Sequence, residues 1–173
     1  MPKRIVDAAT RVVALFAAAT IAGAAGLDLP GTEPKLLPPE QAFRFSARAL
    51  DANTLEARFD VANGYYLYRD KLHFGLEKSS PTLGAATFPS GQRKHDAFFG
   101  EVEIYRGAVT VKLPMAGAAP RQDIVLVAES QGCADIGVCY PPSRQQVRLV
   151  MPAPGAGAGP QVEAVQPRKG LFD

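Results

Sequence analysis

The chain has 173 residues, which is enough for one domain with its own hydrophobic core. Its 19 Lys and Arg against 17 Asp and Glu give a formal net charge of +2. This excess lies at the amino terminus, where Lys3, Arg4 and Arg11 stand against Asp7. The remainder is close to neutral and has no basic stripe that could follow a phosphate backbone, so nucleic-acid binding is excluded.

Residues 1–25 have the layout of a secretory signal peptide. A basic start at Lys3 and Arg4 is followed by an apolar run from Val12 to Ala25 that ends in small residues. The run is rich in alanine and shorter than the roughly 20 apolar residues that a spanning helix needs. We therefore expect cleavage near residue 25, export to the periplasm, and no stable membrane insertion of the mature protein.

Residues 26–39 form a lead-in that is rich in turn and helix-breaking residues, and no element is expected there. From residue 40 to residue 152, short segments alternate apolar and polar residues, as strands do when one face lies on a core and the other in water. These segments are residues 43–47, 55–61, 72–76, 109–113, 124–127 and 147–151.

Turn residues separate the alternating segments, and no window among them is typical of an amphipathic helix. Many short strands at such spacing predict an all-β domain, either an antiparallel sandwich or a barrel. The tail, residues 153–173, opens with a run of Pro, Gly and Ala that cannot build a core, and we expect it to be disordered.

The chain contains two cysteines, Cys133 and Cys139, in a loop between two of the expected strands. Two cysteines in an exported chain can pair, because the compartment is oxidising. The pair could be a redox centre, or it could be a structural disulfide in a secreted protein-binding domain. A zinc site is the weaker reading, since His73 and His95 complete no recognisable ligand pattern. No metal and no other cofactor is expected.

The cysteine loop carries no Lys, Arg or His between Gln131 and Pro142 that would lower the pKa of a thiol. Asp135 lies inside the loop and would disfavour a nearby thiolate. The reduced pair is therefore expected to be a weak nucleophile until a partner docks. One hypothesis for this loop is that Asp135, with a neighbouring acid or tyrosine, tunes proton transfer at the thiols.

Three motifs, in the same order, resemble the N-terminal periplasmic domain of the disulfide reductase DsbD. They are GYYLYR at residues 64–69, DAFFGEVEIYR at residues 96–106 and QGCADIGVCYPP at residues 131–142. The resemblance implies an immunoglobulin-like β-sandwich that acts as a thiol:disulfide oxidoreductase, a protein-disulfide reductase without a bound cofactor. Such a domain would be reduced by one thioredoxin-like partner and would pass electrons to disulfide isomerases and to thiol proteins of cytochrome c maturation.

The same resemblance implies roles for individual residues. Cys139 would form the mixed disulfide with a partner, and Cys133 would resolve it. The segment Asp96–Gly100 would be a cap loop, in which Phe98 lies over the disulfide and moves away on docking, with Phe99 next to it. The other residues expected to flank the site are Tyr66, Tyr68, Asp135 and Tyr140.

The chain departs from the full-length reductase because it contains no multi-helix membrane domain, no thioredoxin-like domain and no Cys-x-x-Cys sequence. Two interpretations remain: a stand-alone version that works with separately encoded partners, or a fragment of a longer protein. The expected disordered tail favours the first, and we expect a monomer. Its electron donor and acceptor would be separate thioredoxin-like periplasmic proteins.

Overall fold

The computed structural model describes residues 36–165, so the predicted signal peptide, most of the lead-in and residues 166–173 lie outside the described residues. The described range contains a one-turn helix, α1 (Pro39–Ala42), and a short 3-10 turn, η1 (Arg69–Lys71). The remaining elements are the strands β1 (Phe43–Asp51), β2 (Thr54–Val61), β3 (Tyr65–Tyr68), β4 (His73–Leu76), β5 (Thr82–Leu83), β6 (Gln92–Asp96), β7 (Gly100–Tyr105), β8 (Ala108–Ala116), β9 (Asp123–Ser130), β10 (Gly132–Ala134), β11 (Ser143–Val150) and β12 (Val162–Glu163).

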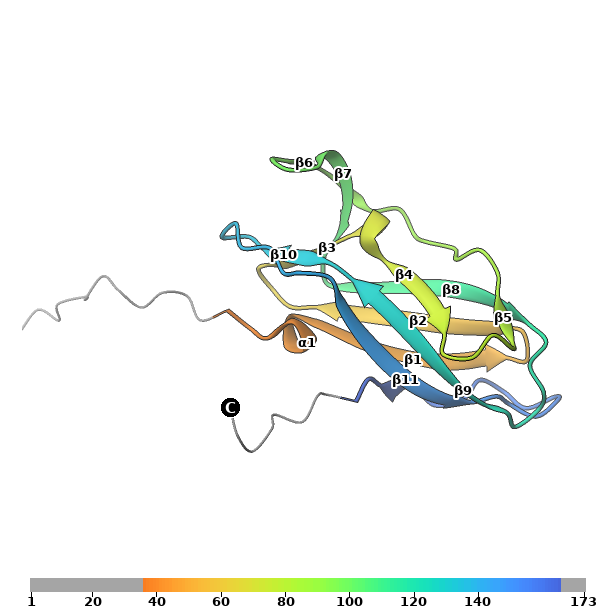
Figure 1. Ribbon diagram of the computed structural model, residues 1–173. Coiled ribbons are helices and arrows are strands. Elements are labelled where there is room, and N and C mark those ends of the chain that lie inside the picture. The colour runs from red at the N-terminus through yellow and green to blue at the C-terminus, as the bar shows by residue number, and fades with distance from the viewer. Residues whose placement is uncertain (1–35, 166–173) are drawn as a thin grey trace, which may run out of the picture. The chain divides into compact units, whose positions relative to one another are not determined.

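These strands form antiparallel sheets in two layers (Figure 1). One layer is the five-stranded sheet β12-β1-β2-β8-β5, and the other is the three-stranded sheet β11-β9-β4. A smaller sheet, β10-β3-β7-β6, lies at one end. The domain is an immunoglobulin-like β-sandwich, which confirms the predicted fold class.

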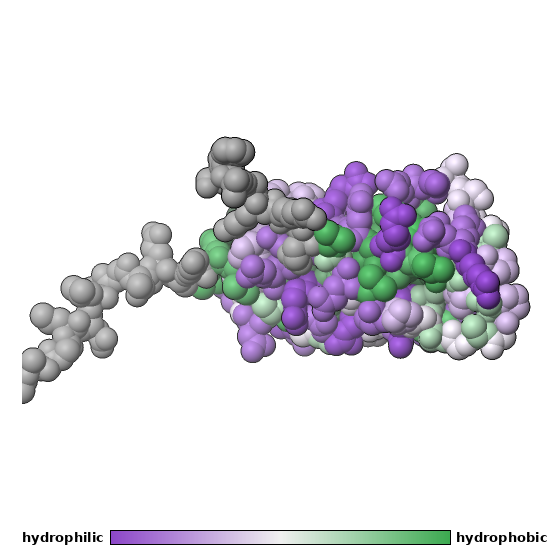
Figure 2. Space-filling model, turned by 90° about the horizontal axis from the view of Figure 1, so that it is seen from below, coloured by the Kyte–Doolittle hydropathy of each residue, from purple (hydrophilic) through white to green (hydrophobic). Residues whose placement is uncertain are grey.

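The core between the two layers follows from the alternation in the sequence. Along β2, the buried side chains alternate with partly exposed ones at every position. Phe45 of β1 packs on Phe59 of β2 with 4.9 Å between ring centroids, and it reaches Phe74 of β4 across the core at 6.5 Å. Burial of each such ring stabilises the fold by roughly 1.5–3 kcal/mol. Outward residues are mostly polar, and Figure 2 shows a face on which hydrophilic side chains surround smaller hydrophobic patches.

The structure differs from the expected disordered tail between Gly159 and Ala164. Val162 and Glu163 form β12, which pairs with the edge of β1. Two more backbone bonds flank this strand: Gly159 N–H donates to the Ala49 carbonyl at 2.8 Å, and Ala164 N–H donates to the Phe45 carbonyl at 2.9 Å. Backbone pairing of this kind needs no hydrophobic pattern, so composition alone could not indicate it.

The end of the expected lead-in also belongs to the fold. Leu36 and Leu37 pack against the core, and the α1 turn begins at Pro39. The Leu37 backbone is held from both sides, because its N–H donates to Tyr65 Oη at 2.9 Å and its carbonyl accepts from Tyr140 Oη at 2.7 Å. Isolated leucines among prolines show no period, which is why the sequence did not indicate an ordered segment here.

The second layer continues toward the end that carries the cysteines. Strand β10 follows β9 after a single residue, and β3 precedes β4 across the η1 turn. In Figure 1 the β6–β7 hairpin stands out from this end, on the same side as β3 and β10. Within residues 36–165, no helix is long and apolar enough to cross a membrane.

Candidate functional site

The two cysteines form a disulfide bond between β10 and the loop that follows it. Cys133 and Cys139 face each other in an antiparallel bridge, with their Cα atoms 3.9 Å apart. Cys133 has an exposed fraction of 0%, whereas Cys139 is exposed. The bond therefore presents one cysteine to solvent and hides the other.

The segment between the cysteines is a tight hairpin. Ala134 N–H donates to the Val138 carbonyl at 2.8 Å, and Gly137 N–H donates to the Ala134 carbonyl at 3.0 Å. Gly137 has a φ of +89°, in the left-handed region that glycine adopts without steric cost. The cysteines thus lie at the mouth of a hairpin.

Gly132 allows β10 to approach two aromatic residues directly. A Cβ atom at this position would lie 2.7 Å from the ring of Phe43 and would collide with the carbonyl oxygen of Tyr66. The reason for glycine here is therefore close packing in a strand. In this register, Cys133 lies opposite Tyr66 of β3.

We expect Gly132→Ala to lower the free energy of unfolding by about 1–3 kcal/mol, because the added methyl group overpacks the contact that seats β10. The matched control is Gly75→Ala in β4, where a Cβ would meet nothing within 4 Å. Denaturant unfolding of both variants checks this. Equal losses at the two positions would contradict the packing argument.

Tyr68 of β3 connects the disulfide to a buried carboxylate. Its hydroxyl donates to Asp96 Oδ2 at 2.7 Å, and it lies 3.2 Å from Cys133 Sγ and 4.0 Å from Cys139 Sγ. Burial, together with the hydrogen bond to Asp96, raises the pKa of Tyr68 far above that of a free phenol. The hydroxyl therefore keeps its proton beside the sulfurs throughout the physiological pH range.

Asp96, the last residue of β6, accepts hydrogen bonds from three donors. Besides Tyr68 Oη, the backbone N–H groups of Phe98 and Phe99 donate to its Oδ1 atom at 2.9 and 3.2 Å. The bond from Tyr68, followed by the bond from Phe98 N–H, holds the pKa of Asp96 below its ordinary value, although burial opposes this. One carboxylate thus orients the Tyr68 hydroxyl and fixes the turn of the predicted cap.

The predicted cap segment is formed differently from the expectation. Phe98 is 81% exposed and is therefore not packed over the disulfide. Phe99 instead packs edge-on against Tyr68, with 5.3 Å between ring centroids, and Lys71 Nζ lies 4.9 Å from the centre of its ring. Adjacent residues in an extended segment point to opposite sides, and the sequence could not indicate which ring faces the site. Gly100 begins β7 directly after this turn.

Asp135 is paired with a cation, and the hypothesis that it tunes proton transfer at the thiols stays a prediction. Its carboxylate forms a bidentate ion pair with Arg106, at 2.9 Å from Nη1 and 2.7 Å from Nη2. The hydrogen bond from Arg106 lowers the pKa of Asp135 and raises the pKa of Arg106. The acid that reaches the disulfide, through Tyr68, is Asp96.

The remaining predicted residues lie around the same centre. Tyr66 packs edge-on against Tyr68 at 5.4 Å, and its ring lies between two cations, Lys94 at 5.3 Å and Arg106 at 5.2 Å. Tyr140 packs against Phe43 behind the loop, and burial raises its pKa to about 12. Tyr140 therefore supports the loop from behind and has no hydrogen bond to either sulfur.

Sequence reasoning missed the cations of this site: Lys71, Lys94 and Arg106. None lies between the cysteines in the sequence. The antiparallel pairing of β6, β7 and β3 brings Lys94 and Arg106 to Tyr66, and Lys71 lies on the η1 turn that follows β3. Within residues 36–165, no group of three or more His, Cys, Asp or Glu side chains is placed to hold a metal ion.

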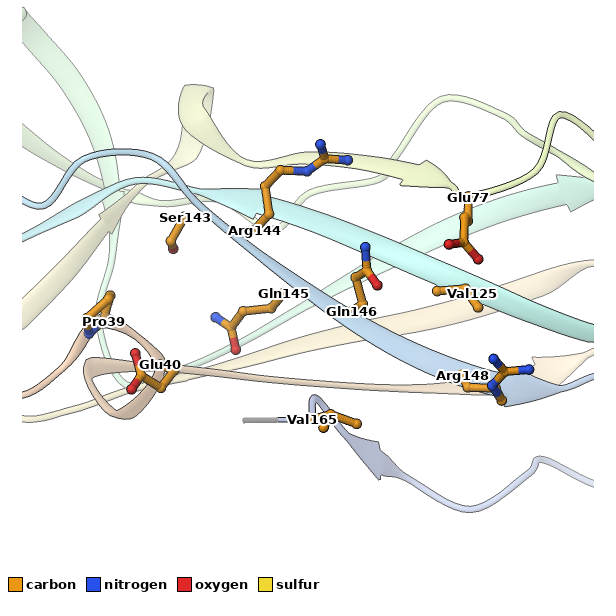
Figure 3. Close-up of a pocket in the computed structure, with 10 residues that line it drawn as sticks. All are labelled: Pro39, Glu40, Glu77, Val125, Ser143, Arg144, Gln145, Gln146, Arg148 and Val165. Carbon is orange, nitrogen blue, oxygen red and sulfur yellow. The ribbon is translucent and has the colours of Figure 1, made fainter. Parts of the chain in front are cut away.

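A groove of about 650 Å³ lies elsewhere, along β11, the end strand of its sheet (Figure 3). Arg144, Gln146 and Arg148 line one side of it, and Gln145 and Glu40 line the other. It contains none of the predicted site residues.

Comparisons with known proteins cover most of the described residues. The family model described as "Thiol:disulfide interchange protein DsbD, N-terminal" matches residues 33–151. The thiol:disulfide interchange protein DsbD of Ralstonia nicotianae is 43% identical over 125 residues, which are 72% of this chain and 20% of that protein. DsbD 1 of Pseudomonas aeruginosa is 40% identical over 121 residues, again 20% of its length. The chain therefore spans about a fifth of the length of these curated relatives.

Two solved structures are similar to this one. The crystal structure of the Neisseria meningitidis DsbD N-terminal domain in the reduced form has 34% sequence identity and a TM-score of 0.63, with 75% of this chain and 96% of that chain covered. The complex between the DsbD N-terminal and PilB N-terminal domains of the same organism has 33% identity and a TM-score of 0.57, with 77% and 94% covered.

Proposed function

Because this chain belongs to the family of DsbD N-terminal domains, we propose that it relays electrons by thiol–disulfide exchange through Cys133 and Cys139. It acts as a thiol:disulfide oxidoreductase on protein partners, and its two cysteines suffice for the chemistry without a bound cofactor. The observation that carries this proposal is the asymmetry of the disulfide, in which Cys139 is exposed and Cys133 is buried beside the Tyr68 hydroxyl.

Reduction of the domain begins when a partner thiolate attacks Cys139 Sγ. A bond forms between the two proteins, the Cys133–Cys139 bond breaks, and its electron pair leaves on Cys133 Sγ, which takes up a proton. The second thiolate of the partner then attacks the partner's own sulfur and releases Cys139 as a thiolate. The partner is oxidised and the domain has gained two electrons.

Transfer to an acceptor runs through the same two sulfurs. The Cys139 thiolate attacks the acceptor disulfide, and Cys133, after losing its proton, attacks Cys139 Sγ in the mixed disulfide. The Cys133–Cys139 bond forms again, and the acceptor leaves as a dithiol. The proton of Cys133 is exchanged with solvent or with the partner, because Tyr68 keeps its own proton and Asp96 is ionised. The Tyr68 hydroxyl lies 3.2 Å from Cys133 Sγ and is placed to hydrogen-bond the thiolate that forms there by turning away from Asp96 Oδ2.

The surface around the disulfide supports a protein partner. Phe98, Phe99, Ile136 and Val138 are exposed large hydrophobic residues, and all four lie on the two loops that flank Cys139. Exposed apolar residues gathered at one place are typical of a docking surface. We propose that thioredoxin-like proteins of the periplasm dock here as donor and acceptor, among them disulfide isomerases and thiol proteins of cytochrome c maturation. The domain meets them as a monomer after removal of residues 1–25.

The reduction potential of the Cys133–Cys139 bond tests this function. In graded glutathione buffers we expect a value within about −180 to −270 mV, the range of exchange catalysts. Mass spectrometry after acid quenching and alkylation reports the reduced fraction. A value well below about −300 mV would indicate a structural disulfide and would favour a protein-binding sandwich instead.

A further inference from the structure

Reduction removes the covalent link that closes the cysteine loop, so the loop then depends on its non-covalent contacts. Its backbone bonds include the one from Ala134 N–H to Val138, inside the hairpin. The contacts that tie the hairpin tip to the rest of the domain are made by Asp135. Its N–H donates to the Gly64 carbonyl at 2.8 Å, and its carboxylate is held by Arg106.

Arg106 is positioned to hold the loop from a neighbouring strand. It follows β7, and its guanidinium lies over the ring of Tyr66 with 5.2 Å from Cζ to the ring centre. Nη1 also donates to the Tyr65 carbonyl at 3.2 Å, so the side chain is fixed on β3 while it binds Asp135. A planar guanidinium with two parallel bonds to one carboxylate defines an orientation, which a single point charge does not.

We propose that Arg106 is a positioning residue that latches the cysteine loop onto β3 through Asp135 and so keeps Cys133 within reach of Cys139 when the disulfide is open. The inference rests on the proposed exchange function. During exchange, Cys133 attacks Cys139 Sγ in the mixed disulfide; the Cys133–Cys139 bond forms, and the partner sulfur leaves with the electron pair as a thiolate. A latched loop raises the effective concentration of the attacking thiolate in this step.

We expect loss of the latch to change the reduction potential only modestly, because the ion pair between Arg106 and Asp135 is partly open to water. The exposed fractions of the Arg106 and Asp135 side chains are 35% and 45%, and exposed ion pairs contribute little. We expect loss of the latch to lower the equilibrium constant for closing the disulfide with glutathione about threefold, which is about 14 mV toward less negative potential. The fraction trapped as the glutathione mixed disulfide should rise by a similar factor.

The test compares Arg106→Gln and Asp135→Asn with a matched control, Arg58→Gln. Arg58 forms an equivalent bidentate pair with Asp60, at 2.6 and 3.1 Å, with side-chain exposures of 39% and 34%. That pair lies within β2 and makes no contact with the cysteine loop. Each purified variant is equilibrated in glutathione buffers, and mass spectrometry after alkylation reports its reduced, disulfide and mixed-disulfide forms.

We expect both latch variants to shift in the same direction and the double variant to shift by less than the sum of the two, because either change breaks the bidentate ion pair. Arg58→Gln should show none. A potential and a mixed-disulfide fraction unchanged in Asp135→Asn, which keeps the shape of the side chain, would overturn the latch even if Arg106→Gln did not fold. A parent potential below about −300 mV would overturn the exchange function instead, and the difference between variant and parent would still decide the latch.

Discussion

Cys139→Ser should abolish exchange with partner proteins, whereas Cys133→Ser should stop it at a mixed disulfide. Cys139 is the exposed cysteine of the pair and can be reached by a partner, while Cys133 has an exposed fraction of 0%. A serine cannot replace the attacking or attacked sulfur, so turnover should fall by at least about a thousandfold in both variants. The two variants differ in what accumulates.

The measurement is a non-reducing gel with mass spectrometry, after each variant has been incubated with a single-cysteine thioredoxin that is activated as its mixed disulfide with thionitrobenzoate. In Cys133→Ser, Cys139 should attack the thioredoxin sulfur, release thionitrobenzoate and form a stable adduct, because neither protein then has a second thiol to resolve it. The variants control for each other, since both lack the same disulfide. An adduct that accumulates in Cys139→Ser and not in Cys133→Ser would reverse the proposed order of attack.

Tyr68→Phe should slow reduction of the disulfide by about a hundredfold, at the lower end of what one hydrogen-bond donor to a developing negative charge contributes. The variant keeps the ring that packs on Phe99 and removes the hydroxyl 3.2 Å from Cys133 Sγ. Without it, the charge that develops on the buried sulfur has no hydrogen-bonding partner. The rate of reaction with dithiothreitol measures the effect, and Tyr105→Phe, which removes a hydroxyl bound to the Pro89 carbonyl, is the control.

The protonation of Asp96 determines how the effect of Tyr68→Phe on the rate of reduction depends on pH. The folded-state pKa of Asp96 is below the ordinary value of an aspartate. Its stabilising contribution is therefore fully present above the ordinary value and is lost as the pH falls through the lower, folded-state value. The ratio of parent to Tyr68→Phe rates should stay constant from about pH 5 to pH 8. A ratio that changed steeply in this window would point to a different titrating group.

The sequence predicted the parts of the fold that depend on side-chain pattern. Strands such as β2 and β8 have one buried and one open face, and this appears directly as alternation. Strand β10 is three residues long, and β12 is held by backbone bonds next to prolines and glycines. Neither strand shows an alternation of apolar and polar residues in the sequence, so neither could be predicted from it.

The sequence predicted most residues of the site but not the hydrogen bonds and ion pairs that join them. The cysteines, Tyr68 and Asp96 were named from the sequence, but their hydrogen-bonded chain joins residues 28 and 65 positions apart. The pairing of Asp135 with Arg106 spans 29 positions. Such contacts depend on sheet register, which local sequence does not specify, and for this reason the ion pair of Asp135 with Arg106 was not predicted.

The short strand β12 has a further consequence for how the protein behaves in solution. Strand β1 is nine residues long and lies next to the end of its sheet, and an open strand edge of that length is a template for pairing with other chains. With β12 and its flanking bonds in place, the carbonyls of Phe45 and Ala49 are already occupied. The segment after Gly159 thus covers part of this sheet edge, and a covered edge is less available for pairing with other chains.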